Sequence, residues 1–420
     1  MKNTRRDFLK IGGLSIAASG LVSPFLTSCV NGEEDTGLVN EIEGVKPLSG
    51  SDYDKRLEKL LKSMREYDIE ALFIEGSTNL KYFFDISWWL SERVFGPIIN
   101  IKKEPVWICP GFELERAREQ VPDGHEIRTW AEHESPYELI RKTIVDLGID
   151  SDKIAVGPSV RSFISEGIQR SLRKDILDGS LAVNMVRAVK TEKELGYMDL
   201  ANRITKKAYR YGFSKLEKGM TRQELGEHIS IAHSKMGVNG GGGPYFGFTS
   251  AFPHGTKQRR DLHDGDIILV DGGCSVEDFR SDVTRTIVYG EPDKRQREVF
   301  NAVLKAQRAA HDAIRPGIAC GEIDRVARKV IEDEGFGPGY KYFAHRLGHG
   351  IGMDVHEYPY LVKDNPLLLK EGMTFSNEPG IYIYGEFGVR IEDCFAVTGD
   401  GAHMLGGMLT ADIENPFGNE

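Results

Sequence analysis

The stretch LVDGGCSVEDFRSDVTRTIVYG, residues 269–290, places two carboxylates beside two β-rich segments. Asp271 follows the apolar run 267–270, which predicts a buried strand, and Asp282 opens the β-rich segment 283–289. A carboxylate beside a buried strand costs free energy unless it is paired or binds a cation. Each aspartate could instead cap a turn, as the neighbouring glycines favour. The pair therefore indicates a metal site only in combination with further ligands.

Three segments downstream supply an imidazole and two more carboxylates. In HRLGHGIGMDVHEYPY, residues 345–360, glycines flank His349 and leave its ring room to approach a ligand. The spacing of seven from His349 to His356 fits neither a zinc finger nor HExxH, and a lone histidine is more often structural. Glu378 ends a strand-like run at a Pro–Gly turn, and Glu392 alternates with apolar neighbours in a predicted strand.

These side chains form one candidate ligand set. Four carboxylates and one imidazole make a hard, oxygen-rich set that suits manganese or cobalt, or zinc in a two-ion site. Two bridging carboxylates would hold the ions about 3.5–4 Å apart, so that both polarise one water and one carbonyl. Arg390 could instead neutralise Glu392 as a structural ion pair. The candidate ligands are Asp271, Asp282, His349, Glu378 and Glu392.

The motifs VDGG…SDVTRT, GHGIGMDVHE, NEPG and RIED, in this order, resemble those of the creatinase and aminopeptidase P family, the M24-type pita-bread metallopeptidases. The resemblance covers residues 186–400 through motifs and residues 50–185 through layout. It implies an α/β N-terminal creatinase-like domain followed by an α+β pita-bread catalytic domain.

The resemblance also implies roles for the five ligands. Asp282 and Glu392 would bridge two metal ions, and Asp271 would complete one site. His349 and Glu378 would complete the other, and Glu378 would also carry the proton of the attacking water.

Three further residues are implied to act in catalysis. His254 in FPHG and His356 in DVHE resemble the family's two non-ligand histidines, which contact the substrate and stabilise the tetrahedral intermediate. Arg390 resembles the partner that orients a ligand carboxylate.

The expected cofactors are two divalent metal ions, with manganese preferred and cobalt or zinc as alternatives. The expected substrate is a peptide with proline at its second position. Creatinase lacks the metal carboxylates, and the related lyases carry an aspartate where this chain has Gly273. Methionine aminopeptidases resemble only the second half of the chain. Xaa-Pro aminopeptidase and Xaa-Pro dipeptidase (prolidase) therefore remain.

A dipeptidase needs a cation for the substrate carboxylate, ideally an arginine. Between His356 and Glu378 the sequence has only lysines, which favours an Xaa-Pro aminopeptidase over the alternative prolidase. A non-catalytic metal- or peptide-binding relative is a third hypothesis. The chain also departs from the family at Phe279 and Cys394, and its glycine run 240–243 predicts a flexible edge of the pocket.

Four parts are expected along the chain. Residues 51–185 alternate helix and strand patterns, as an α/β domain does, without a GxGxxG motif. Residues 186–420 form the predicted catalytic domain. Its first two helices should begin after Thr191 and Thr221, each followed three residues later by a glutamate that completes a capping box.

The remaining two parts precede these domains. Residues 1–28, with Arg5 and Arg6 before an uncharged stretch, resemble a twin-arginine export signal. LTSC resembles a lipobox, which implies cleavage before Cys29, a lipid on its sulfur and a membrane-anchored lipoprotein, periplasmic or on the cell surface. Residues 29–50 predict a flexible tether, or alternatively an arm packed on the body.

The composition is that of a globular protein, with 40% hydrophobic and 28% charged residues among 420. A net charge of −10 argues against a nucleic-acid partner. Family members are commonly dimers, which leaves a homodimer open. Four scattered cysteines are predicted to be buried without a disulfide framework: Cys109, Cys274, Cys320 and Cys394.

Overall fold

The computed structural model describes residues 37–418, and residues Val39–Glu420 form one compact unit. The predicted export signal and Cys29 lie outside the described residues. Among the described residues, no helix is both long and apolar enough to cross a bilayer.

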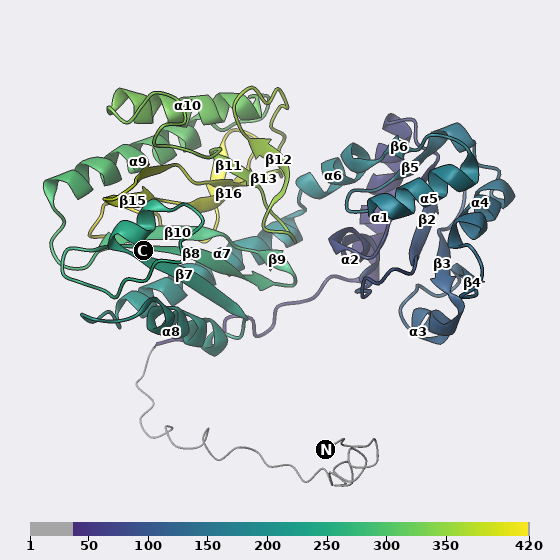
Figure 1. Cartoon of the computed structure of the whole chain (residues 1–420), viewed down its shortest axis with the longest axis horizontal. Helices are drawn as coiled ribbons and strands as arrows, with labels where there is room; N and C mark the ends of the chain where they lie inside the picture. The colour runs from purple at the N-terminus through teal and green to yellow at the C-terminus, as the bar shows by residue number, and fades with distance from the viewer. Residues whose placement is uncertain (1–36, 419–420) are drawn as a thin grey trace, which may run out of the picture. The chain divides into compact units, whose positions relative to one another are not determined.

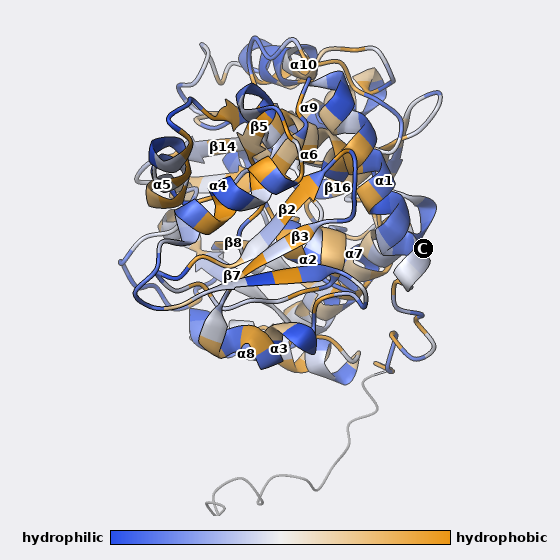
Figure 2. Ribbon diagram, turned by 90° about the vertical axis from the view of Figure 1, so that its right-hand side faces the viewer, coloured by the Kyte–Doolittle hydropathy of each residue, from blue (hydrophilic) through white to orange (hydrophobic). Residues whose placement is uncertain are grey.

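The first domain is built on a six-stranded mixed sheet with the order β4-β3-β2-β1-β5-β6. Strand β2 is antiparallel to both of its neighbours, and the other pairs are parallel. All residues of β2 and β3 are buried, and Figure 2 shows hydrophobic residues in these strands and hydrophilic residues along helix α1. The strands are β1 (Ala71–Phe73), β2 (Gly96–Asn100), β3 (Val106–Pro110), β4 (Glu126–Trp130), β5 (Ile154–Val156) and β6 (Leu177–Asp178).

Helices surround this sheet, and the isoleucines of α4 and α5 pack against it in one core. The helices are α1 (Gly50–Glu66), α2 (Thr78–Phe84), α3 (Leu114–Arg118), α4 (Pro136–Asp146), α5 (Ser162–Leu172) and α6 (Ser180–Ala188). Helix α6 is the last element before the second domain.

The second domain places strands between two helical layers (Figure 1). Helices α7 and α8 lie against β7 and β8, while α9 and α10 share a core with β13, β15 and β16. The helices are α7 (Glu192–Phe213), α8 (Arg222–Lys235), α9 (Lys294–Ala313) and α10 (Cys320–Asp333).

The strands of this domain form two sheets and a hairpin. One sheet has the order β10-β8-β7 with β9 beside β8, the other has the order β12-β11-β13-β16-β17, and β14 pairs with β15. The strands are β7 (Gly240–Phe246), β8 (Ile267–Val276), β9 (Phe279–Arg280), β10 (Val283–Val288), β11 (Gly348–Gly350), β12 (Glu357–Leu361), β13 (Thr374–Asn377), β14 (Gly380–Ile383), β15 (Phe387–Arg390), β16 (Asp393–Val397) and β17 (Ala402–Met404). The predicted fold class, an α/β domain followed by an α+β pita-bread domain, is confirmed.

Both predicted capping boxes are present. The Thr191 side chain accepts a hydrogen bond from the backbone N–H of Glu194, and the Glu194 carboxylate accepts one from the backbone N–H of Thr191. Thr221 and Glu224 make the same exchange at the start of α8. These caps fix where the two helices begin.

The glycine run 240–243 is a regular strand, so the prediction of a flexible edge is wrong. Its residues are part of β7 and pair in register with β8, where Gly243 lies opposite Asp271. Close packing requires glycine here, because a Cβ at Gly242 would lie 2.7 Å from a methyl carbon of Val270. The run therefore pairs closely with β8 and packs β7 against helix α8.

The described part of the segment 29–50 packs on the second domain. The backbone N–H of Glu41 donates to the carbonyl of Met236 at 3.1 Å, and the hydroxyl of Tyr197 donates to the carbonyl of Lys46 at 2.5 Å. The alternative of a packed arm, rather than a flexible tether, describes these residues.

Candidate metal centre

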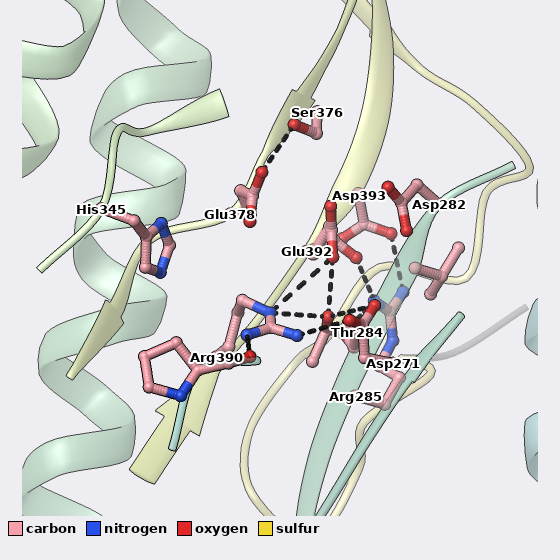
Figure 3. Close-up of polar contacts among 12 residues, drawn as sticks. Asp271, Asp282, Thr284, Arg285, His345, Ser376, Glu378, Arg390, Glu392 and Asp393 are labelled. Carbon is pink, nitrogen blue, oxygen red and sulfur yellow. Dashed lines mark hydrogen bonds and ion pairs between the residues drawn. The ribbon is translucent and has the colours of Figure 1, made fainter. Parts of the chain in front are cut away.

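The five predicted ligands come from separate elements that meet between the two sheets of the second domain. Residue Glu392, between β15 and β16, forms an isolated bridge with Thr284 of β10, in which its N–H donates to the Thr284 carbonyl at 3.1 Å. This bridge joins the two sheets at the site. Figure 3 shows the resulting group, with carboxylates gathered around a threonine and an arginine.

Three of the five ligands form a compact group. One ligand atom each from Asp282, His349 and Glu392 all lie within 4.8 Å of one another, and all three residues are buried. The Nε2 atom of His349 lies 3.6 Å from Asp282 Oδ2 and 3.2 Å from Glu378 Oε1, which adds a fourth ligand beside the group. Ligand atoms this close together could bind a common cation.

Asp271 joins the group from its other side. Its Oδ2 lies 2.7 Å from Arg390 Nη2, and its Oδ1 lies 3.1 Å from the hydroxyl oxygen of Thr284. The same hydroxyl oxygen is 2.6 Å from Glu392 Oε2. One hydroxyl proton can serve only one of these two carboxylates at a time.

Arg390 contacts two of the carboxylates and the threonine between them. Its Nε donates to Thr284 Oγ1 at 2.9 Å and lies 3.9 Å from Glu392 Oε2. Its nearer carboxylate is Asp271, so the arginine orients Asp271 more directly than Glu392. This contact fits the predicted orienting role, which remains a proposal.

The histidine ligand has a defined tautomer. His349 Nδ1 lies 3.1 Å from the carbonyl oxygen of Gly350, which can only accept, so Nδ1 carries the proton. The Nε2 atom is then directed at the carboxylates. Ser376 supports both neighbours, because its hydroxyl donates to Glu378 Oε1 at 3.0 Å and accepts the backbone N–H of His349 at 3.0 Å.

Charge in the cluster is unbalanced. Burial, followed by the charge of Asp271, raises the pKa of Asp282 well above its ordinary value. Burial, followed by the charge of Asp282, does the same to the pKa of Glu392. Arg390 alone cannot compensate four neighbouring carboxylates, whereas divalent cations held by these oxygens would. The donor set therefore fits the metal ions that the sequence predicts.

Glu378 behaves differently from these two carboxylates. Burial opposes its ionisation, but the hydrogen bond with His349 and the charges of nearby histidines and Arg390 lower its pKa to about 2. Burial lowers the pKa of His349. The hydrogen bond and the negative charge of Glu378 raise it by more, so the pKa lies above its ordinary value. A metal ion can bind Nε2 only while this nitrogen carries no proton, so the affinity of the site for metal should fall as pH falls.

The cluster opens into a cavity of about 490 Å³. His254 and His356, the two predicted substrate histidines, are both on its wall. The His356 ring stacks on His349 with centroids 3.8 Å apart and planes inclined by 30°. Besides the ligands, the lining includes His254, Arg280, His345, Arg346, His356 and Arg390.

Several residues of this site were not predicted from the sequence. The hydroxyl of Tyr382 lies 2.9 Å from both Arg390 Nη1 and His345 Nε2 and so links the two. Arg280 and Arg346 add cations to the cavity wall. Tyr382 lies in the same segment as Glu378, but nothing in the local pattern marks its hydroxyl as a partner of Arg390.

The layered second domain with a buried cluster of carboxylates and one imidazole defines the class of metal-dependent hydrolases. Residues 196–399 match the profile of metallopeptidase family M24, and residues 56–189 match the creatinase/prolidase N-terminal domain. Uncharacterized peptidase SAB1567 of Staphylococcus aureus is 35% identical over 353 residues, covering 83% of this chain and 98% of the relative. The chain belongs to metallopeptidase family M24.

Solved structures agree with this assignment. The dipeptidase PepE from Mycobacterium ulcerans is 31% identical with a TM-score of 0.79, covering 86% of this chain and 97% of that one. The prolidase from Thermococcus sibiricus is 27% identical with a TM-score of 0.75, covering 85% of this chain and 97% of that one. The family is one of metal-dependent peptidases, so the chain is a peptidase of this class.

Proposed function

We propose that the protein is a two-metal exopeptidase that hydrolyses Xaa-Pro dipeptides. The observation that carries the proposal is one cavity with carboxylate and imidazole ligands at its base and two arginines, Arg280 and Arg346, on its wall. The ligands would support hydrolysis, and the arginines would bind the free carboxylate that distinguishes a dipeptide from a longer peptide.

The five candidate ligands would hold the metal ions. Divalent ions bound there would polarise the peptide carbonyl and lower the pKa of the attacking water. Manganese remains the preferred ion because oxygen ligands predominate, with cobalt or zinc as alternatives.

Glu378 is the proposed proton acceptor. Its lowered pKa keeps it ionised at neutral pH, and the Ser376 hydroxyl fixes Oε1 so that the other oxygen is available to water. The proton would then pass to the amine of the leaving residue.

His356 and His254 would contact the substrate. Burial, then the neighbouring charges of His349 and Arg346, lower the pKa of His356 to about 4, so its ring is neutral at pH 7. A neutral imidazole can donate one hydrogen bond to a developing oxyanion without adding charge to the metal cluster.

Arg346 is placed to bind the substrate carboxylate. Its guanidinium lies 4.2 Å from the centroid of Tyr360, and its Nη2 lies 3.4 Å from His356 Nδ1. Arg280 is anchored by donating from Nε to the carbonyl of Met353 at 2.9 Å. Both arginines precede His356 in the sequence, outside the interval 356–378 that contains only lysines as cations. Their position supports the dipeptidase over the aminopeptidase.

The preference for proline rests on the motif resemblance and on the likeness to a prolidase structure. The test uses metal-loaded protein with Ala-Pro, Ala-Pro-amide and Ala-Pro-Ala, and measures released alanine. We expect Ala-Pro to be cleaved at least about tenfold faster than its amide, as loss of one charge-assisted contact implies. Cleavage of Ala-Pro-Ala alone would establish the aminopeptidase instead, and no cleavage with two metals bound would establish the non-catalytic relative.

We also propose export by the twin-arginine route with a lipid on Cys29. The support is the sequence of residues 1–29 alone. Intact-mass analysis of protein from the native membrane fraction should show a chain that begins at Cys29 with acyl groups; a chain that still begins at Met1 would contradict it.

A further inference from the structure

The loop that carries His356 is held by groups that do not reach the cavity. The segment 351–357, here called the His356 loop, comprises the connection from β11 to β12 together with the first residue of β12. Its last residue, Glu357, is 7% exposed, is not part of the cavity lining and lies in a cluster of buried charges. Its carboxylate contacts Arg187 Nη2 and lies 3.3 Å from Lys190 Nζ.

The same arginine binds a second residue of the loop. Arg187 Nη2 also lies 2.8 Å from Asp354 Oδ2, and the backbone N–H of Asp354 donates to Glu357 Oε1 at 3.0 Å. Arg187 lies in α6, the last helix of the first domain, and is 7% exposed. One guanidinium therefore ties two points of the His356 loop, on either side of His356.

The first domain contributes two more contacts, both from the start of α2. The Thr78 hydroxyl donates to Asp354 Oδ1 at 2.7 Å. Arg187 Nη1 donates to Asn79 Oδ1 at 2.7 Å. Asp354 thus accepts hydrogen bonds from α2 through one oxygen and from α6 through the other.

The His356 loop is tightly packed at Gly352. A Cβ at Gly352 would lie 2.8–3.0 Å from the carboxylate of Glu357, so the loop closes directly over that carboxylate. The carbonyl of Gly352 accepts the backbone N–H of Arg280 at 2.8 Å. The loop is consequently fixed on the catalytic side by β9 and on the other side by the first domain.

We infer that Arg187, Asp354 and Thr78 are positioning residues through which the first domain sets the His356 ring against His349. The inference rests on the proposed function for its effect on rate. It gives the first domain a role in turnover, because His356 would meet the oxyanion only while the loop is held. Displacing a substrate-contacting group by about 1 Å can cost as much as 100-fold in rate.

The test compares Thr78→Val with Ser77→Ala. The valine keeps the volume of Thr78 but removes the hydroxyl bound to Asp354. Ser77 is its neighbour, and its hydroxyl donates to Glu75 within the first domain, so its loss leaves the loop untouched. We expect Thr78→Val, and likewise Asp354→Asn, to lower kcat about tenfold with unchanged KM for Ala-Pro and full metal content. Ser77→Ala should match the wild type.

A double-mutant cycle separates positioning from general damage. In a His356→Ala background, Thr78→Val should have no further effect on kcat. An equal loss in both backgrounds, or loss of bound metal in Thr78→Val, would overturn the inference.

A readout independent of turnover is the ¹H–¹³C resonance of the His356 ring in zinc-loaded protein. We expect it to shift in Thr78→Val and to stay unchanged in Ser77→Ala. If the wild type cleaves no peptide, the proposed function fails, but this shift still supports the positioning role and its absence refutes it.

Discussion

Replacing Arg346 by methionine should weaken hydrolysis of dipeptides without affecting their amides. Methionine retains an unbranched stem that can lie on the ring of Tyr360, where the guanidinium now sits 4.2 Å from the centroid. The change removes the cation proposed to bind the substrate carboxylate. A hydrogen bond to a charged group contributes about 1.5–3 kcal/mol, so kcat/KM for Ala-Pro should fall roughly 10- to 150-fold.

The assay compares Ala-Pro with Ala-Pro-amide, because the two substrates differ only in the carboxylate that Arg346 would bind. Arg259→Met is the matched control, since it removes the same charge from an exposed residue outside the cavity. Metal content should be unchanged in both variants. An equal loss on both substrates would refute the assignment, because it would show that Arg346 acts through His356 or the fold. No loss on either would show that the carboxylate is bound elsewhere.

Two further predictions concern the ligands themselves. Glu378→Ala should reduce kcat by at least about 100-fold, because removal of a general base typically costs that much, with released alanine as the measurement. Full activity in this variant would contradict its proposed role. Asp282→Asn should lower metal content, measured by elemental analysis, yet leave the metal-free protein at least as stable as the wild type at pH 8 in denaturant titrations. The reason is that burial and the charge of Asp271 raise the pKa of Asp282 in the folded chain. Ionisation of Asp282 therefore opposes folding. This destabilisation of the wild type grows as pH rises from the pKa of the unfolded chain, about 3.9, towards the pKa of the folded chain. A metal-free variant that is less stable at pH 8 but not at pH 4 would contradict the sign of this effect.

Sequence motifs were sufficient to predict the fold class, and they singled out five candidate ligands that the structure brings to one cavity. Individually, Asp271 and Glu392 have ordinary explanations as a turn residue and an ion-paired strand residue. Their order along the chain, together with His349, distinguishes these two carboxylates from ordinary turn and ion-pair residues. The structure gathers these residues at one cavity, while their roles as ligands stay predictions until metal is measured.

Contacts made only in the folded chain could not be predicted. Thr284 lies in the quoted SDVTRT motif, yet its hydroxyl acquires a role only because the two sheets bring Glu392 and Asp271 to it. Arg346 lies outside the sequence interval 356–378, and only the folded chain places its guanidinium on the cavity wall. Arg187 is remote in sequence from Asp354 and meets it through the packing of two domains.

Anomalous diffraction from manganese-loaded crystals tests the central claim most directly, because it locates the ions independently of activity. We predict two anomalous peaks per chain, about 3.5–4 Å apart, with carboxylate oxygens of Asp282 and Glu392 between them. A single peak, or two peaks without these carboxylates as shared ligands, would contradict the two-metal site.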